Sequence, residues 1–391
     1  MQASLALAAM LATQILVSLA SLVAPVLAPL AAKDFGYEPY TVGIWVSVMY
    51  GAASLSSLAS GGTIARLGAI RASQFSLLAS GLGILLAATG STPILLLGAL
   101  FMGAGYGPTT PASSHILART TRPDRMNLVF SLKQTGVPAG NALAGAIMPS
   151  AALLLGWRGA TMLAGGICIV MAILLQPLRK GFDGDRDAAR PLFDTATFLK
   201  PFREVLGDPA IRLLALASMA YAGMQVCLGT FLVALLTHRA GMELVAAGAL
   251  LSAAQTAGVV GRIVWGLVAD HWARPSLVLG LLGLVAAVCA FAAGAFSDAW
   301  PLPLIAAVCV AFGGTAVAWN GVFFAQIARA APPDRVGSMT GGATFFTYGG
   351  VLFAPVAFSA ILAATGSYAL GFALMALFTA AAGLAFLRRL R

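Results

Sequence analysis

Two basic residues lie inside long apolar stretches of this chain, where a charged side chain needs a partner. Arg262 stands eight residues before Asp270, and Lys133 stands eight residues after Arg125. Because a helix rises ~1.5 Å per residue, each cation lies roughly 12 Å from the polar end of its stretch. A guanidinium keeps its charge in proteins, so Arg262 must meet an anion or a set of neutral acceptors.

The apolar stretches contain no acidic residue that could neutralise these two cations. All 13 Asp and Glu residues fall in polar segments or at the edges of the apolar stretches. An interior with fixed positive charge and no fixed negative charge favours anions. We therefore expect Arg262 and Lys133 to bind an anionic small molecule, and Lys133 also to be able to carry a proton. The alternatives are that Arg262 bonds to helix carbonyls and that Lys133 reaches the interface on its flexible side chain.

Six further residues place polar atoms inside apolar stretches and could complete a binding site. Amides orient polar ligands, but they also tie helices together, and most aromatic residues in such stretches only pack. The six candidates are Gln134, Gln255, Asn320, Trp319, Tyr348 and Tyr221.

The composition is that of a protein with many membrane-spanning segments. Of 391 residues, 60% are hydrophobic and only 9% are charged, which is less charge than soluble domains carry. The net charge of +10 comes from basic residues spread over short polar segments, so we expect no nucleic-acid partner. No cysteine or histidine spacing predicts a metal site, and no nucleophile–base pair can be identified. We therefore expect no cofactor and no enzymatic activity.

Twelve apolar stretches are long enough to cross a membrane as helices of about 20 residues. They fall into two groups of six on either side of a polar segment. The predicted fold is an all-α integral membrane protein with 12 transmembrane helices in two pseudo-symmetric six-helix bundles, 1–178 and 209–391, joined by a solvated cytoplasmic linker loop, 179–208. The stretches are 5–32, 42–64, 72–91, 93–117, 128–155, 159–178, 210–237, 244–268, 276–296, 300–328, 337–364 and 367–387.

The basic residues also predict the orientation of the chain in the membrane. If both termini are cytoplasmic, only three of the 23 Lys and Arg residues lie on the outer side, namely Lys33, Arg158 and Arg239. Cytoplasmic loops of membrane proteins carry just such an excess of positive charge. We expect a multi-pass protein of the bacterial inner membrane with both termini in the cytoplasm.

The two groups of apolar stretches repeat parts of their sequence. RTTRPDR at 119–125 returns as RAAPPDR at 329–335, 210 residues later, and each copy stands between two apolar stretches. A glycine followed by a basic residue five positions later occurs both at 61–66 and at 266–271. Parallel repeats of this kind are typical of transporters with a central binding site between their halves.

The segments GGTIARLGAIR (61–71) and GLVADHWAR (266–274) resemble the loop G-x-x-x-D-R-x-G-R-R of the major facilitator superfamily. The resemblance covers essentially the whole chain and implies a secondary transporter that works by alternating access. Ala65 stands where the loop has its aspartate, so the resemblance does not supply the charge contact of the first copy. The matching gating positions are Gly61, Arg66, Gly68, Arg71, Gly266, Asp270 and Arg274.

A finer resemblance concerns the cargo. GRIVWGLVAD (261–270) looks like the eighth helix of monocarboxylate transporters and oxalate/formate exchangers, and SLKQTGVPAG (131–140) looks like a segment of cyanate-type and other organic-anion permeases. The first resemblance implies that Arg262 binds a substrate carboxylate. The lysines of this branch in the first and eleventh helices are absent, so a two-cation site would use Lys133. We expect a monomeric transporter of a small carboxylate-type anion, coupled to protons or a counter-anion, with membrane lipid around it.

Two other functions on the same fold remain as alternatives. An efflux pump for drugs or other hydrophobic compounds would be expected to carry an acidic residue inside a membrane helix. A sensor or assembly factor that has lost transport would be expected to carry a sizeable soluble domain. The sequence offers neither feature.

Overall fold

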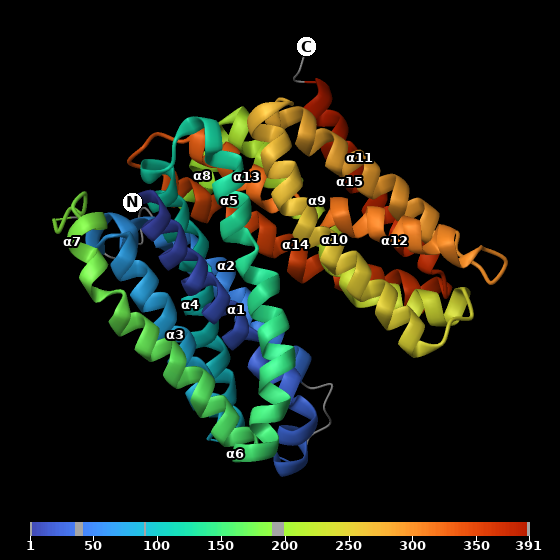
Figure 1. Ribbon diagram of the computed structural model, residues 1–391, viewed down its shortest axis with the longest axis horizontal. Coiled ribbons are helices and arrows are strands. Elements are labelled where there is room, and N and C mark those ends of the chain that lie inside the picture. The colour runs from blue at the N-terminus through green and yellow to red at the C-terminus, as the bar shows by residue number, and fades with distance from the viewer. Residues whose placement is uncertain (1, 36–41, 90, 190–198, 389–391) are drawn as a thin grey trace. The chain divides into compact units, whose positions relative to one another are not determined.

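The computed structural model describes residues 2–35, 42–89, 91–189 and 199–388, and all regular structure in these ranges is helical (Figure 1). The first half contains α1 (Gln2–Phe35), α2 (Val42–Leu67), α3 (Ala69–Ala87), α4 (Thr92–Thr120), the turn η2 (Pro123–Arg125), α5 (Met126–Gln134) and α6 (Gly136–Leu174). The turn η3 (Gln176–Leu178) precedes the linker, which contains α7 (Arg179–Phe182) and α8 (Lys200–Gly207). The second half contains α9 (Pro209–Arg239), α10 (Leu244–His271), α11 (Pro275–Gly294), α12 (Leu302–Ala316), α13 (Asn320–Ala330), α14 (Val336–Thr365) and α15 (Tyr368–Arg388).

The helices have the length and composition of membrane spans. Within the described ranges, nine helical stretches are long and apolar enough to cross a membrane. One of them runs from Pro123 to Phe182 and holds two spans, because Gly156 interrupts α6 with a φ of 70° and a ψ of 163°. Helices α2 and α4, with 26 and 29 residues, are also long enough to span. The fold is therefore that of an integral membrane protein with 12 transmembrane helices, which confirms the predicted fold class.

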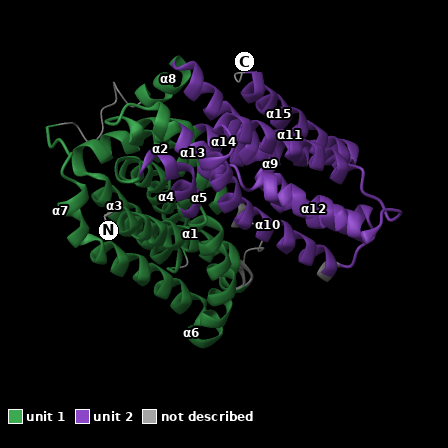
Figure 2. Ribbon diagram, turned by 45° about the horizontal axis from the view of Figure 1, so that its top comes forward, with its two compact units in different colours: residues 1–121, 133–207, 327–345 green, residues 122–132, 208–326, 346–391 purple. Residues whose placement is uncertain are grey.

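Residues Met1–Thr121, Lys133–Gly207 and Ile327–Phe345 form one compact unit, called unit 1 below (Figure 2). Inside it, α3 packs against α4, α1 against α6, and α2 against α4. Glycines allow these helices to approach closely, as is common between membrane helices. A Cβ atom on Gly83 of α3, for example, would lie 2.6 Å from the carbonyl oxygen of Gly98 on α4.

Residues Arg122–Leu132, Asp208–Gln326 and Phe346–Arg391 form the second compact unit, called unit 2. Its longest helix, α9, begins after Asp208, whose side chain accepts hydrogen bonds from the first free N–H groups of the helix. The core contains stacked aromatic rings, with Phe231 and Phe358 only 4.0 Å apart between ring centroids. Phe372 of α15 packs edge-on against Phe358, and neither of these two rings is exposed.

The two units exchange short segments. The first part of α5, up to Leu132, belongs to unit 2, and the first part of α14, up to Phe345, belongs to unit 1. Each exchanged segment includes the start of the helix that follows one copy of the repeated RxxxPDR sequence. Lys133 consequently belongs to unit 1 and Arg262 to unit 2.

The linker is less solvated than the sequence predicts. Asp183 is only 4% exposed, and its carboxylate accepts hydrogen bonds from the backbone N–H groups of Ile70 at 2.8 Å and Arg71 at 3.2 Å. Helix α3 follows Gly68, which has no side chain to cap the helix, so its first N–H groups need an outside acceptor. Asp183 supplies that acceptor, and burial raises the pKa of its carboxyl group against the effect of these hydrogen bonds.

Candidate functional site

Lys133 lies in the core of unit 1. Its side chain is on the last turn of α5 and only 2% exposed. The ammonium donates to Oε1 of Gln14 on α1 at 2.7 Å and to Oγ1 of Thr110 on α4 at 3.3 Å. No ion pair found in the described part of the chain involves Lys133. The charge is therefore held by neutral oxygens from two other helices.

The partners of Lys133 continue into a chain of polar side chains along α1. The amide nitrogen of Gln14 donates to Oγ of Ser18 at 3.1 Å, and Ser18 is fully buried. The sequence folds in this way because Gly136 and Gly140 of α6 face α1. A Cβ atom on Gly136 would lie 2.9 Å from Cβ of Gln14, and one on Gly140 would contact the carbonyl of Ile15. Small residues in α6 thus let the polar face of α1 come close to the end of α5.

Arg262 lies in the core of unit 2. It is 1% exposed on α10, and its Nε–H donates to the carbonyl oxygen of Val317 at 2.9 Å. Trp265 on the same helix donates its indole N–H to the carbonyl of Gly314 at 3.0 Å. A Cβ atom on Gly261 would lie 2.7 Å from that same carbonyl oxygen, so α10 can approach only because this position has no side chain. A guanidinium carries five N–H donors, and the contact with Val317 uses one of them.

The carbonyls that α10 contacts belong to an interrupted helix. Helix α12 ends at Ala316 and α13 begins at Asn320, so residues 317–319 lie in a break within one apolar stretch. The backbone N–H of Ala318 donates to Thr315 instead of Gly314, which leaves the carbonyl of Gly314 for the indole of Trp265. Breaks of this kind occur in membrane proteins where other groups satisfy the freed backbone.

Trp319 and Asn320, two of the predicted site residues, follow this break and share one acceptor. Trp319 donates its indole N–H to Oε1 of Gln225 at 3.2 Å, and Asn320 donates its amide N–H to the same oxygen at 3.3 Å. Gln225 is on α9 and is absent from the candidates that the sequence suggests. Its signal was available, because it is an amide inside an apolar stretch just as Gln255 is.

The other predicted residues are Tyr221, Gln255, Gln134 and Tyr348, and all four lie on helices. Tyr221 donates its hydroxyl to the carbonyl of Leu279 at 2.8 Å and packs edge-on against Trp319. Gln255 is partly exposed on α10, and its amide nitrogen lies 3.6 Å from the position that a Cβ atom on Gly229 would occupy. Gln134 is buried beside Lys133, and Tyr348 is buried on α14.

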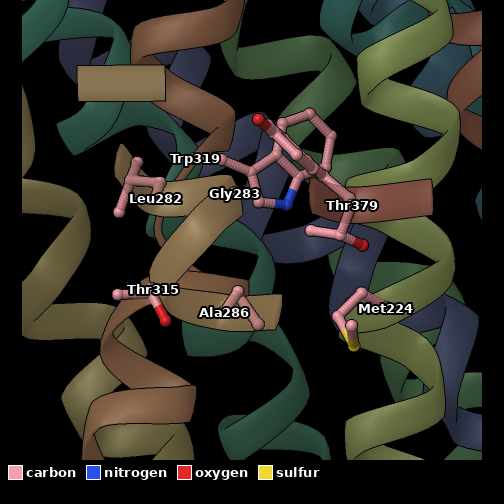
Figure 3. Close-up of a pocket in the computed structure, with 9 residues that line it drawn as sticks. Met224, Leu282, Gly283, Ala286, Thr315, Trp319 and Thr379 are labelled. Atoms are coloured by element: carbon pink, nitrogen blue, oxygen red, sulfur yellow. The ribbon is translucent and has the colours of Figure 1, made fainter. Parts of the chain in front are cut away.

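A narrow internal space adjoins Tyr221 and Trp319 in unit 2. Its empty volume is about 170 Å³, made of gaps too narrow to hold a water molecule. Figure 3 shows Trp319, Thr379 and Met224 among the side chains that surround it. This space is the packed interior of the unit, and it does not provide a ligand cavity.

The second copy of the predicted gating loop has a clear structural role. Asp270 at the end of α10 accepts hydrogen bonds from Asn127 (backbone N–H at 3.1 Å, side-chain amide at 2.7 Å) and from the backbone N–H of Leu128 at 2.8 Å. It therefore caps the start of α5. A Cβ atom on Gly266, one turn earlier, would lie 2.7 Å from Oγ of Ser131. The glycine lets α5 lie against α10, and the aspartate fixes the start of α5.

The first copy of the loop uses different contacts. A Cβ atom on Gly61 would lie 2.7 Å from Cβ of Ser338, so α2 and the start of α14 also meet at a glycine. Gly68 has a φ of 92°, which favours glycine, and a Cβ atom there would contact Asp183. Arg71 donates from its guanidinium to Gln74 at 3.0 Å. Arg66 is partly buried at the end of α2, and Arg274 of the second copy is exposed before α11.

Linker residues bind to the helix ends around Ala65, where the loop lacks its aspartate. Asp185 contacts His115 and Arg119 of α4, both at 2.6 Å, and the backbone N–H of Asp187 donates to the carbonyl of Ala65 at 2.8 Å. The hydrogen bond from His115, together with the charge of Arg119, lowers the pKa of Asp185 to about 2. Sequence patterns do not indicate that this linker is anchored, because its residues are polar and its partners are distant in the chain.

The described residues include no cluster typical of a metal site. No group of three or more His, Cys, Asp or Glu side chains within those ranges could hold a metal ion. The four cysteines are free and buried.

Comparison with known proteins gives a family and a fold. Solved structures with the same fold include a human organic anion transporter, MFSD10 (TETRAN), with a TM-score of 0.80, 14% identity and coverage of 99% of this chain and 100% of that one. The E. coli fucose:proton symporter FucP has a TM-score of 0.76 and 17% identity, with coverage of 99% of both chains. A bacterial homologue of the iron transporter ferroportin in an outward-facing state has a TM-score of 0.75 and 15% identity, with coverage of 97% of both chains.

The sequence comparisons agree with the fold. No curated protein matches the chain at a significant level. The family described as Major Facilitator Superfamily matches residues 9–355, which is most of the chain. The chain is therefore a member of the Major Facilitator Superfamily.

Proposed function

We propose that this transporter moves a small organic anion of the carboxylate type across the bacterial inner membrane by alternating access. The observation that carries the proposal is the burial of two cations, Lys133 and Arg262, in apolar stretches whose sequence contains no Asp or Glu. Lys133 is 2% exposed in unit 1 and Arg262 is 1% exposed in unit 2. Lys133 donates to neutral oxygens of Gln14 and Thr110, and Arg262 donates to the carbonyl oxygen of Val317. Fixed positive charge inside the membrane attracts anions, so an anionic cargo is favoured.

The fold by itself does not determine which substrate is transported. The structures most similar to this chain include an organic anion transporter, a fucose:proton symporter and a homologue of an iron transporter. The choice of an anion rests on Arg262 and Lys133, and it agrees with the resemblance of residues 261–270 to the monocarboxylate branch.

The two cations offer different chemistry to a carboxylate. The planar guanidinium of Arg262 can bind both carboxylate oxygens, whereas the ammonium of Lys133 acts as a compact charge. Lys133 can also release its proton, so coupling to protons and exchange for a counter-anion are both compatible with the site.

We also propose roles for the remaining predicted residues and an orientation of the chain in the membrane. Gln134, Gln255, Asn320, Trp319, Tyr348 and Tyr221 surround or orient the cargo, and the two loop copies act at the gate. Both termini are cytoplasmic, because the Lys and Arg residues are then concentrated on the inner side. The transporter acts as a monomer, since one chain supplies both cations. Residues 1–178 and 209–391 are the two moving halves, with 179–208 as the linker between them.

The test is uptake into proteoliposomes. Purified wild-type protein is assayed with radiolabelled formate, acetate, lactate, oxalate and cyanate, and with an uncharged sugar as a negative control. We expect at least one anion to be taken up, and we expect Arg262→Gln and Lys133→Gln each to reduce that uptake about 100-fold. Arg239→Gln, which removes an exposed charge at the end of α9, is the matched control and should transport normally. Equal uptake by the wild type and Arg262→Gln would refute the assignment.

A further inference from the structure

Gln225 has a side-chain orientation that its neighbours determine. Its Oε1 accepts from the indole N–H of Trp319 at 3.2 Å and from the amide N–H of Asn320 at 3.3 Å. An indole N–H can only donate, so the oxygen of Gln225 must face Trp319 and its NH₂ group must point away. Asn320 must in turn present its nitrogen to that oxygen. The two amides are therefore fixed without ambiguity between their oxygen and nitrogen atoms.

This fixed arrangement leaves one donor and one acceptor next to each other. The amide nitrogen of Gln225 and the side-chain oxygen of Asn320 take part in no hydrogen bond among the described residues, and both side chains are partly exposed. A third amide, that of Gln255, lies near the face of α9 that carries Gln225. Gln255 approaches Gly229, which stands one helical turn after Gln225 on that face.

We propose that Gln225 and Asn320 form a subsite that recognises a hydroxyl group, so that the cargo is a hydroxylated carboxylate. A hydroxyl oxygen accepts from the NH₂ group of Gln225 while its hydrogen is donated to Oδ1 of Asn320. A carboxylate or a ketone can only accept, and it would leave the oxygen of Asn320 unpaired. Trp319 is a positioning residue, because it sets the orientation of Gln225. This inference rests on the proposed transport of an organic anion and narrows the class of that anion.

The subsite is tested by comparing pairs of anions that differ by one hydroxyl group. The full chain is reconstituted in nanodiscs, and affinities are measured from ligand-dependent thermal stabilisation for glycolate and acetate, lactate and propionate, and malate and succinate, with glycerol as an uncharged hydroxyl compound. In at least one pair we expect the hydroxylated member to bind about tenfold more tightly, the effect of one well-paired hydrogen bond. Gln225→Leu should reduce this ratio to about one and leave the affinity for the other member unchanged.

Two further variants keep the test decisive. Trp319→Phe removes the indole N–H, so the amide of Gln225 is free to turn over and the ratio should fall as well. If Gln225→Leu does not fold, Asn320→Ala takes its place in the test and should likewise lower the ratio. Thr256→Val, at an exposed position of α10 where the hydroxyl bonds within its own helix, is the control and should keep the wild-type ratio.

The possible results separate this inference from the proposed function. Equal affinity for both members of every pair overturns the hydroxyl subsite and leaves anion transport intact. Binding of glycerol but of no anion, lost in Gln225→Leu, supports the subsite and overturns the anion assignment. Binding of none of these compounds contradicts both. A ratio that persists in Gln225→Leu shows that the hydroxyl is recognised elsewhere and overturns the role of Gln225.

Discussion

Arg262 donates its Nε–H to the carbonyl oxygen of Val317, 2.9 Å away, at the residue that follows the end of helix α12. Trp265, on the next turn of α10, donates in the same way to Gly314 at 3.0 Å. A carbonyl without a donor is costly within a membrane. The same arginine therefore stabilises the break between α12 and α13 and, in the proposed function, binds the cargo, so binding and the geometry of the break are linked.

These two roles of Arg262 can be separated by mutation. Arg262→Gln should reduce uptake about 100-fold, because a charge-assisted hydrogen bond to the cargo carries about 1.5–3 kcal/mol and the charge itself is lost. It should also lower stability by about 1–2 kcal/mol through the lost donor to Val317. Uptake in proteoliposomes and the thermal unfolding midpoint of the purified protein measure the two effects.

Trp265→Phe provides the comparison, because it removes a donor to the same break and keeps the charge of Arg262. We expect a similar loss of stability with uptake largely retained. If Trp265→Phe and Arg262→Gln lose uptake equally, Arg262 acts only through the helix break and does not contact the cargo.

For Lys133, unlike Arg262, we expect a substitution to reduce uptake without reducing stability. Its ammonium is buried against neutral oxygens, so removing the charge also removes a desolvation cost. Oε1 of Gln14 keeps a donor in Lys133→Met, because Thr110 donates to it at 3.4 Å. We therefore expect Lys133→Met to unfold at the same temperature as the wild type or higher, and to lose uptake about 100-fold.

The control for Lys133 is Lys180→Met, which removes an exposed lysine in the linker and should change neither quantity. A large drop in the unfolding temperature of Lys133→Met, with uptake falling only in proportion to the folded fraction, would show that the lysine is structural. Transport that survives with a changed pH dependence would instead assign Lys133 to proton coupling alone.

The sequence predicted the elements of this fold well because the relevant signals are local. Apolar stretches of about 20 residues define spans regardless of their neighbours, and the repeated RxxxPDR segments relate the halves. The depth of Arg262 follows from its spacing to Asp270. Its contact with Val317 does not, because that contact depends on how α10 packs against a break 55 residues further along the chain.

The residues that the sequence did not identify are those whose role depends on distant partners. Gln225 becomes informative only when the break places Trp319 and Asn320 beside α9. Asp183 looks like any linker acid until α3 is seen to begin at Gly68 without a capping side chain. Hydropathy and spacing carry no information about such tertiary contacts, whereas a fixed amide or a capped helix end is defined by them.

Asp270 should contribute to stability as a helix cap. Asp270→Ala removes the acceptor for three N–H groups at the start of α5 and should cost about 1–2 kcal/mol. Asp270→Asn keeps one oxygen acceptor and should lose less than half as much. Thermal unfolding of both variants measures the effect, with Asp298→Asn as the control at an exposed position between α11 and α12. If both Asp270 variants unfold like the wild type, the cap contributes nothing.

Asp185 gives a prediction in which the pH dependence has a definite sign. His115 and Arg119 hold its pKa at about 2 in the folded protein, against about 3.9 in an unfolded chain. A carboxylate whose pKa is lowered by folding stabilises the fold fully above the unfolded value and loses this effect as the pH falls towards 2. Because the group is partly exposed, solvent screening reduces the contribution to about 1 kcal/mol.

Asp185→Asn should therefore unfold about 2 °C below the wild type at pH 7, and the difference should shrink between pH 4 and pH 2. A difference that stays constant over that range would show that the contact with His115 and Arg119 does not depend on the charge of Asp185.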